Sequence, residues 1–208
     1  MSKKKPNGNF DVAALAASNT ASCEAHIAYF TMMAQTDAKH EKTAKQWANE
    51  QRTLFVPQFF EDCGQVVTAG LVSASDMTRA IGSLVDTGGK RAPVYGLAKI
   101  VGTIRSLAAD AKSPIVSDLH RAMILALSTE WVTNKEIHET IGKLAFCCPR
   151  ETAPTQRSTS AYALRSLGLV EERKDGRTKF MRLADNEGAA ALARIIAKSR
   201  SHRQAMTA

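Results

Sequence analysis

The sequence predicts a mainly α-helical protein, with a helical N-terminal region and a smaller C-terminal part that contains a β hairpin. Three observations lead to this fold class. Segments with apolar residues three and four positions apart recur along the chain, which is the spacing of one helix face. Thr133 and Glu136 stand three residues apart before one such segment, as at a capped helix start. Asp175 and Gly176 separate two short strand-like runs, as in a hairpin turn.

The composition favours an anionic partner. The 208 residues carry a formal net charge of +8, and 44% of them are hydrophobic, which is enough for an ordinary core. A basic chain of this kind most often binds nucleic acid or an anionic membrane surface. No run approaches the roughly 20 apolar residues that span a bilayer, and the start MSKKKPNGNF lacks the apolar core of a signal peptide. We therefore expect a cytoplasmic protein with no membrane partner.

Residues 1–9 are expected to be a flexible basic tail, and residues 10–112 a helical region. Within that region the alanine-rich residues 11–36 predict one or two helices. Residues 37–54 predict a polar helix with a narrow apolar stripe. The stripe consists of Ala44, Trp47, Ala48 and Leu54.

Two more helices are predicted before Ser113. The segment SASDMTRAIGSLV is a short capped helix, and VYGLAKIVGTIRSLAADA is a longer one. The longer helix has a heptad-like stripe, which we interpret as a contact with neighbouring helices or, alternatively, as a dimer seam. A proline follows Ser113 and disfavours helix there, so we place a domain boundary at this point. The stripe consists of Val94, Leu97, Val101, Ile104 and Ala108.

Residues 113–185 predict three helices and a hairpin, and residues 186–208 a closing helix from about Glu187 to Lys198 with a basic tail. In the second of the three helices, Ile137 and Ile141 are expected to face the core. In the third, we expect Ala161, Leu164 and Leu167 to be buried. The hairpin runs from Leu169 to Leu183, with its turn at Lys174-Asp175-Gly176-Arg177.

From about Ile115 to Leu183 the order is therefore helix, helix, helix and basic hairpin. The segments TNKEIHETIG and LRSLGLVEE and the hairpin tip DGR carry this order. In layout the sequence resembles the winged helix-turn-helix superfamily, and within it the MarR-type bacterial regulators. The resemblance implies a DNA-binding domain whose third helix is the recognition helix and whose hairpin is a two-stranded wing.

A helix that enters the major groove needs small or polar side chains at its leading end and an apolar rear face. The run TAPTQRSTSAYALRSL has both, although Tyr162 in it is equally suited to packing on its neighbours. Glutamine and arginine can contact adenine and guanine with two hydrogen bonds, and the hairpin cations suit phosphates. The predicted DNA-binding residues are Thr155, Gln156, Arg157, Ser158, Thr159, Tyr162, Arg165, Arg173, Lys174, Arg177 and Lys179.

The sequence offers little for catalysis or metal binding, so we expect no enzyme, no cofactor and no metal. The segment TGGKRAPVYG lacks the spacing of a phosphate-binding loop, and the histidines are scattered. Cys147 and Cys148 near His138 match no usual zinc spacing, although a redox-sensing pair is an alternative. Four cysteines in a chain of this length indicate reduced thiols rather than a disulfide framework.

The predicted function is binding of double-stranded DNA, most simply as a transcriptional regulator that acts as a homodimer. Alternatives are an accessory nucleic-acid-binding protein of a plasmid or phage, in replication, partition or conjugation, and an RNA-binding protein. A third alternative is a winged-helix module that docks another protein, with the N-terminal helices as its main interface.

Overall fold

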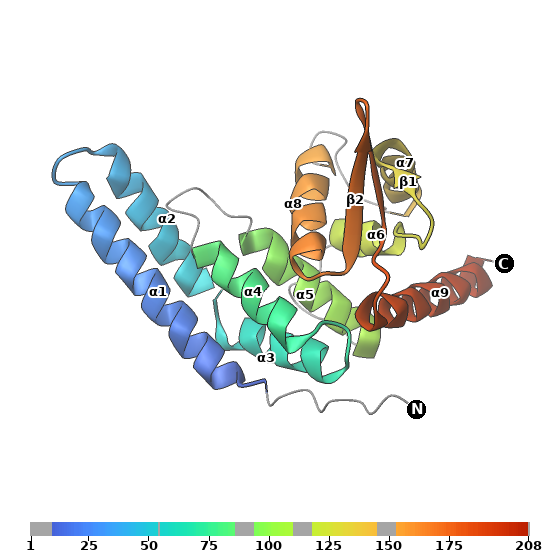
Figure 1. The fold of residues 1–208 in the computed structure, drawn as a ribbon, viewed down its shortest axis with the longest axis horizontal. Helices are drawn as coiled ribbons and strands as arrows, with labels where there is room; N and C mark the ends of the chain where they lie inside the picture. The colour runs from blue at the N-terminus through green and yellow to red at the C-terminus, as the bar shows by residue number, and fades with distance from the viewer. Residues whose placement is uncertain (1–9, 54, 86–93, 110–117, 145–152, 208) are drawn as a thin grey trace.

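The computed structural model describes residues 10–53, 55–85, 94–109, 118–144 and 153–207. Its N-terminal helices are α1 (Val12–Met33), α2 (Lys39–Thr53), α3 (Pro57–Thr68), α4 (Ala74–Val85) and α5 (Val94–Ala109). The later elements are α6 (Asp118–Leu125), β1 (Val132–Thr133), α7 (Asn134–Leu144), α8 (Ala153–Ser166), β2 (Val170–Asp175), β3 (Thr178–Leu183) and α9 (Glu187–Thr207). The mainly helical class is confirmed. Figure 1 shows α1 and α2 at one end of the molecule, and α8 beside the β2–β3 hairpin above α5.

The first two helices form an antiparallel pair. A single helix, α1, covers residues 12–33, and the Asp11 carboxylate caps it by accepting a hydrogen bond of 2.9 Å from the Ala14 amide. In α2, Ala44 and Trp47 are buried as predicted. Ala48 is exposed, contrary to the prediction, because it lies about 100° around the helix from Trp47. Leu54 lies outside the described residues.

Helix α3 was not expected from the sequence. Its residues include Gly64, which disfavours helix, and its apolar residues cluster instead of spreading into an even stripe. The helix nevertheless buries Phe59, Phe60, Val66 and Val67. Burial of large apolar side chains against the other helices outweighs the propensity penalty of one glycine, which is roughly 1 kcal/mol.

Helix α5 lies at the centre of the fold. It packs against α3, α6, α8 and α9, and Leu97, Val101 and Ile104 are buried within the chain. The interpretation of its stripe as an intramolecular contact is therefore confirmed, although Ala108 is exposed. The side chain of Val94 lies outside the described part. One core cluster contains residues from both sides of Ser113.

The predicted capping box at the start of α7 is confirmed. The Thr133 amide donates to Glu136 Oε2 at 2.6 Å, and the Glu136 amide donates to Thr133 Oγ1 at 3.2 Å. The Glu136 carboxylate accepts hydrogen bonds from the Thr133 amide and the Thr133 hydroxyl, and these hold the pKa of the Glu136 carboxyl below its usual range. Ile137 and Ile141 are buried, as expected.

The sheet has three antiparallel strands in the order β1-β3-β2, where the sequence predicted two. Val132 pairs with Met181 and Thr133 with Phe180, so the residues just before α7 form the extra strand. A strand of two residues has no periodicity that a sequence pattern could reveal. Its pairing with β3 attaches the hairpin to the start of α7.

Helix α8 ends in a glycine motif that leads directly into the hairpin. Gly168 has a φ of +69°, its amide donates to the Arg165 carbonyl at 2.9 Å, and the Leu169 amide donates to the Leu164 carbonyl at 3.0 Å. These are the two bonds of a Schellman motif. Leu164 and Leu169 are both buried beside it, so β2 starts immediately alongside α8.

Helix α9 is longer than predicted and continues to Thr207. Leu192 and Ile196 are buried on its inner face. The Arg200 guanidinium donates to the carbonyls of Leu125 and Leu127, which satisfies acceptors at the end of α6. In the described part of the chain, no helix is both long and apolar enough to cross a membrane.

Replacing Gly168 by alanine should destabilise the fold by about 1–2 kcal/mol, because a side chain disfavours positive φ. The added Cβ would also lie 3.2 Å from the Asp76 carboxylate. Gly142→Ala is the matched control, since Gly142 is an exposed residue of α7 with nothing within 4 Å of the added Cβ. That change should stabilise the helix slightly. Urea unfolding of both variants measures the difference, and equal stabilities would contradict the prediction.

Candidate nucleic-acid interface

Helix α8 presents a narrow polar face to solvent. Ser158 and Arg165 are exposed and Tyr162 is half-buried, at the spacing of four and three that keeps them on one side of the helix. The opposite side buries Ser160, Ala163 and Leu164, and Ala161 is buried next to the exposed face. Of the predicted contact residues in this helix, three side chains therefore share a solvent-facing surface.

Thr159 lies at the crossing of α8 with α5. A Cβ added to Gly96 would come within 2.3 Å of Thr159 Cγ2 and 3.0 Å of its carbonyl oxygen. The two helix backbones therefore approach closely at this point, and the Thr159 methyl group faces α5. The side chains of Thr155, Gln156 and Arg157 lie outside the described part, although their backbone forms the start of α8.

The register of the hairpin determines which charges share a face. Lys174 is paired with Lys179, and Arg173 with Phe180. The loop is Gly176-Arg177, one residue later than the Asp175–Gly176 turn predicted from the sequence. The reason is burial, because Val170 pairs with Leu183 and both are buried in the core.

Cross-strand partners lie on the same side of a sheet, so the hairpin has two distinct faces. We call the side that carries Glu172, Lys174 and Lys179 the helix-side face, since Glu172 contacts α8. The opposite side is the outer face. It carries Glu171, Arg173, Asp175, Thr178, Phe180 and Arg182.

Ion pairs neutralise the root of the hairpin and leave its outer half positive. Arg165 of α8 donates to Glu172 at 2.7 Å, and Arg182 donates to Glu171 at 2.9 Å. Among the described residues, no carboxylate lies within ion-pair distance of the four cations nearer the tip. These four, all exposed, are Arg173, Lys174, Arg177 and Lys179.

The Arg165–Glu172 pair joins the exposed face of α8 to the helix-side face of the hairpin. Both lie on the same edge of the molecule, with the hairpin tip projecting beyond the N-terminal end of α8 (Figure 1). Lys174 and Lys179 stand directly opposite each other, an arrangement of like charges that destabilises a sheet. Such a breach of a local rule is typical of a functional surface.

Sequence reasoning missed Trp131, Arg182 and the two glutamates as members of this region. The guanidinium carbon of Arg173 lies 4.6 Å from the centroid of the Trp131 ring, and that of Arg182 lies 4.7 Å from it. Alternation along each strand predicts that Arg173 and Arg182 share a face, but no sequence signal links them to Trp131. The link depends on the pairing of β1 with β3.

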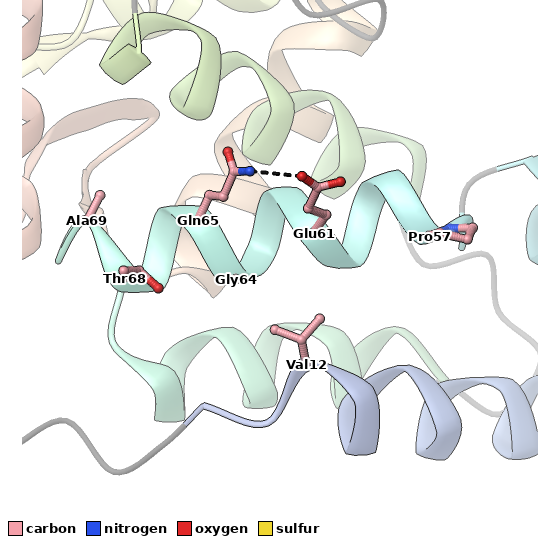
Figure 2. A pocket seen from close by; sticks show the side chains of 7 residues that line it. All are labelled: Val12, Pro57, Glu61, Gly64, Gln65, Thr68 and Ala69. Atoms are coloured by element: carbon pink, nitrogen blue, oxygen red, sulfur yellow. Dashed lines mark hydrogen bonds between the residues drawn. The ribbon is translucent and has the colours of Figure 1, made fainter.

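A wide, shallow groove between the first turn of α1 and helix α3 has little that could perform chemistry. Its volume is about 770 Å³. Figure 2 shows Val12 opposite Gly64, and Glu61 accepting a hydrogen bond of 3.0 Å from Gln65. Among the described residues that line it, Glu61 is the one that carries a charge. A single exposed carboxylate bonded to a neighbouring amide makes no catalytic or metal-binding set.

The two buried thiols each lie near a buried carboxylate, Cys23 near Glu50 and Cys63 next to Asp62. Burial and nearby glutamates raise the pKa of Cys23 to about 11, and burial also raises the pKa of Cys63. Both thiols therefore stay protonated at neutral pH and are poor nucleophiles. Among the described residues, no group of three or more potential ligands is placed to hold a metal ion. Cys147 and Cys148 lie outside those residues.

Asp62 and His120 have opposite effects on the pH dependence of stability. Burial raises the pKa of Asp62 above its usual value of 3.8, against the opposing effects of Gln58 and Arg105. The contribution of Asp62 to the free energy of unfolding is therefore fully present at low pH, and it is lost as the pH rises through the folded-state pKa. Burial, and then the charge of Lys99, lowers the pKa of His120 from 6.5 to about 4.

No family model, no curated protein and no solved structure matches this chain.

The low pKa of His120 predicts a loss of stability in mild acid. The unfolded chain binds a proton on this ring below about pH 6.5, while the folded chain binds it only near pH 4. Stability should fall over this interval by up to about 3 kcal/mol. Urea unfolding of the wild type and of His120→Gln at several pH values measures this loss, since the difference between their free energies of unfolding should change between pH 6.5 and pH 4. If the two free energies of unfolding change with pH in parallel, His120 is not the group that causes the loss.

Proposed function

We propose that the protein binds double-stranded DNA through the exposed face of α8 and the β2–β3 hairpin. The observation that carries the proposal is the group of four hairpin cations that have no ion pair among the described residues, on a hairpin joined to α8 by the Arg165–Glu172 ion pair. Exposed lysines and arginines without acidic partners suit phosphates, because binding releases the counterions condensed on the duplex. The groove-facing residues would then come from α8.

The order of elements supports a winged helix arrangement for this part of the chain. Helix α6, strand β1, helices α7 and α8, and the β2–β3 hairpin follow one another as in that superfamily. In this proposal α8 is the recognition helix and the hairpin is the wing. A transcriptional regulator that binds as a homodimer is the simplest biological role, since a two-fold site doubles the contacts of one domain.

A protein-docking module is the second candidate, and one observation favours it. Among the described residues, Tyr29 and Met32 are the large apolar side chains that are more than half exposed, at 53% and 57%. They lie one turn apart near the end of α1. A partner protein that covered them would bind with little salt dependence, whereas duplex affinity should fall steeply with salt.

Lys174→Ala combined with Lys179→Ala should weaken binding to every duplex alike, by roughly tenfold at about 0.1 M salt, and should reduce the salt slope by about 2. Lys39→Ala with Lys45→Ala is the matched control, because it removes the same charge from exposed lysines of α2, at the other end of the molecule. Fluorescence anisotropy with labelled duplexes across a salt series measures both. Equal slopes for the two double variants would exclude this hairpin surface.

Gln156→Ala with Arg157→Ala should reduce discrimination among sequences while leaving general affinity nearly unchanged. Each two-bond contact to a base is worth about 1–3 kcal/mol of discrimination. The chain offers a matched control in the adjacent Gln51 and Arg52 of α2. The readout is the ratio of affinities for a duplex selected from a random pool and for an unselected one. If this ratio survives in the α8 variant, the proposed recognition helix is wrong.

A further inference from the structure

Trp131 is in contact with two guanidinium groups from different strands. Arg173 of β2 and Arg182 of β3 both lie within 5 Å of the centroid of its ring, at 4.6 Å and 4.7 Å. Trp131 directly precedes β1 and is half-buried. Because Val132 pairs with Met181, the backbone holds the indole beside the outer face of the hairpin.

The two arginines differ in how their charge is balanced. Arg182 donates from Nε and Nη2 to Glu171 Oε2, at 3.0 Å and 2.9 Å. Arg173 lies over Trp131 and also over Phe180, at 5.0 Å from that ring centroid. Within the described residues it has no ion pair with a carboxylate. Two aromatic rings therefore hold an exposed cation whose charge is still available.

Stacking of this kind restricts a guanidinium without using its donors. The attraction acts between the cation and the face of the ring, so the N–H groups at its edge can still bind an anion. An arginine restrained before binding loses less conformational freedom when it contacts a phosphate. Arg173 thus differs from Lys174 and Lys179, which have no described aromatic contact on the helix-side face.

We propose that Trp131 is a positioning residue for Arg173, holding its guanidinium ready to bind a phosphate of the duplex at the outer face of the hairpin. This inference rests on the proposed function. Arg182, paired with Glu171, fixes the indole from the neighbouring strand. Phe180 restrains Arg173 as a second ring. Trp131 acts through Arg173 and makes no contact with the duplex itself.

A double-mutant cycle tests the coupling. Trp131→Leu should lower duplex affinity about three- to tenfold, which corresponds to the usual cost of immobilising one long side chain on binding, and Arg173→Ala should lower it at least as much. The double variant should bind no more weakly than Arg173→Ala alone. Trp131→Phe, which keeps an aromatic face, should retain most of the affinity. Combining Trp131→Leu with Lys179→Ala, on the other face, should give additive losses.

A spectroscopic readout separates positioning from general support of the fold. The chain has two tryptophans, so Trp47→Phe leaves Trp131 as the sole indole fluorophore. Its emission should change when an unlabelled duplex is added, because a phosphate bound to Arg173 changes the electric field at the indole ring. In the same background, Arg173→Ala should abolish the change while duplex still binds at higher concentration.

Additive losses in the Trp131–Arg173 cycle, or an emission unchanged by bound duplex, would overturn the inference. If Trp131→Leu fails to fold, the emission of Trp131 in the Trp47→Phe background decides the inference, because that measurement needs no change at residue 131. The proposed function fails separately. The proposed function is wrong if the protein does not bind duplex DNA. If duplex affinity depends on Lys174 and Lys179 as expected but Trp131 and Arg173 are not coupled, only the positioning role of Trp131 is wrong.

Discussion

The close crossing of α5 and α8 is the contact on which the rest of the structure depends. Gly96 lets the backbone at Thr159 approach so closely that a methyl group would not fit between them. Helix α5 also packs on α3, α6 and α9, so this crossing connects the N-terminal helices to the element that leads into the hairpin. A shift of α8 at this point would move the exposed face of α8 and the hairpin together.

Short connections fix the position of the hairpin relative to α8. The Schellman motif at Gly168 turns the chain from α8 into β2 through only three residues, Leu167 to Leu169. Burial of Val170, Met181 and Leu183 then holds the hairpin root in the core, while its tip projects into solvent. The hairpin is therefore rigid at its base, and its charges have definite faces. Lysines point to the side of α8, and Arg173 points to the opposite side, over Trp131.

Charges on this surface are balanced at the root of the hairpin and unbalanced near its tip. Carboxylates occur at the hairpin root, where Glu171 and Glu172 neutralise Arg182 and Arg165 and fix the strands to each other and to α8. Nearer the tip the cations have no such partners among the described residues. An unbalanced group of charges has a stability penalty in the free protein, and an anionic ligand removes that penalty on binding.

The sequence was enough to predict the elements whose patterns involve residues only a few positions apart. The capping box at Thr133 and Glu136, the α5 stripe of Leu97, Val101 and Ile104, and the alternation of the hairpin strands are all of this kind. Only the tertiary structure decided that α3 is helical despite Gly64, that the hairpin loop is Gly176-Arg177, and that Trp131 lies beneath two arginines. Each of these depends on contacts between residues far apart in the chain. Burial and strand pairing choose among local alternatives of similar free energy, and a local pattern carries no information about them.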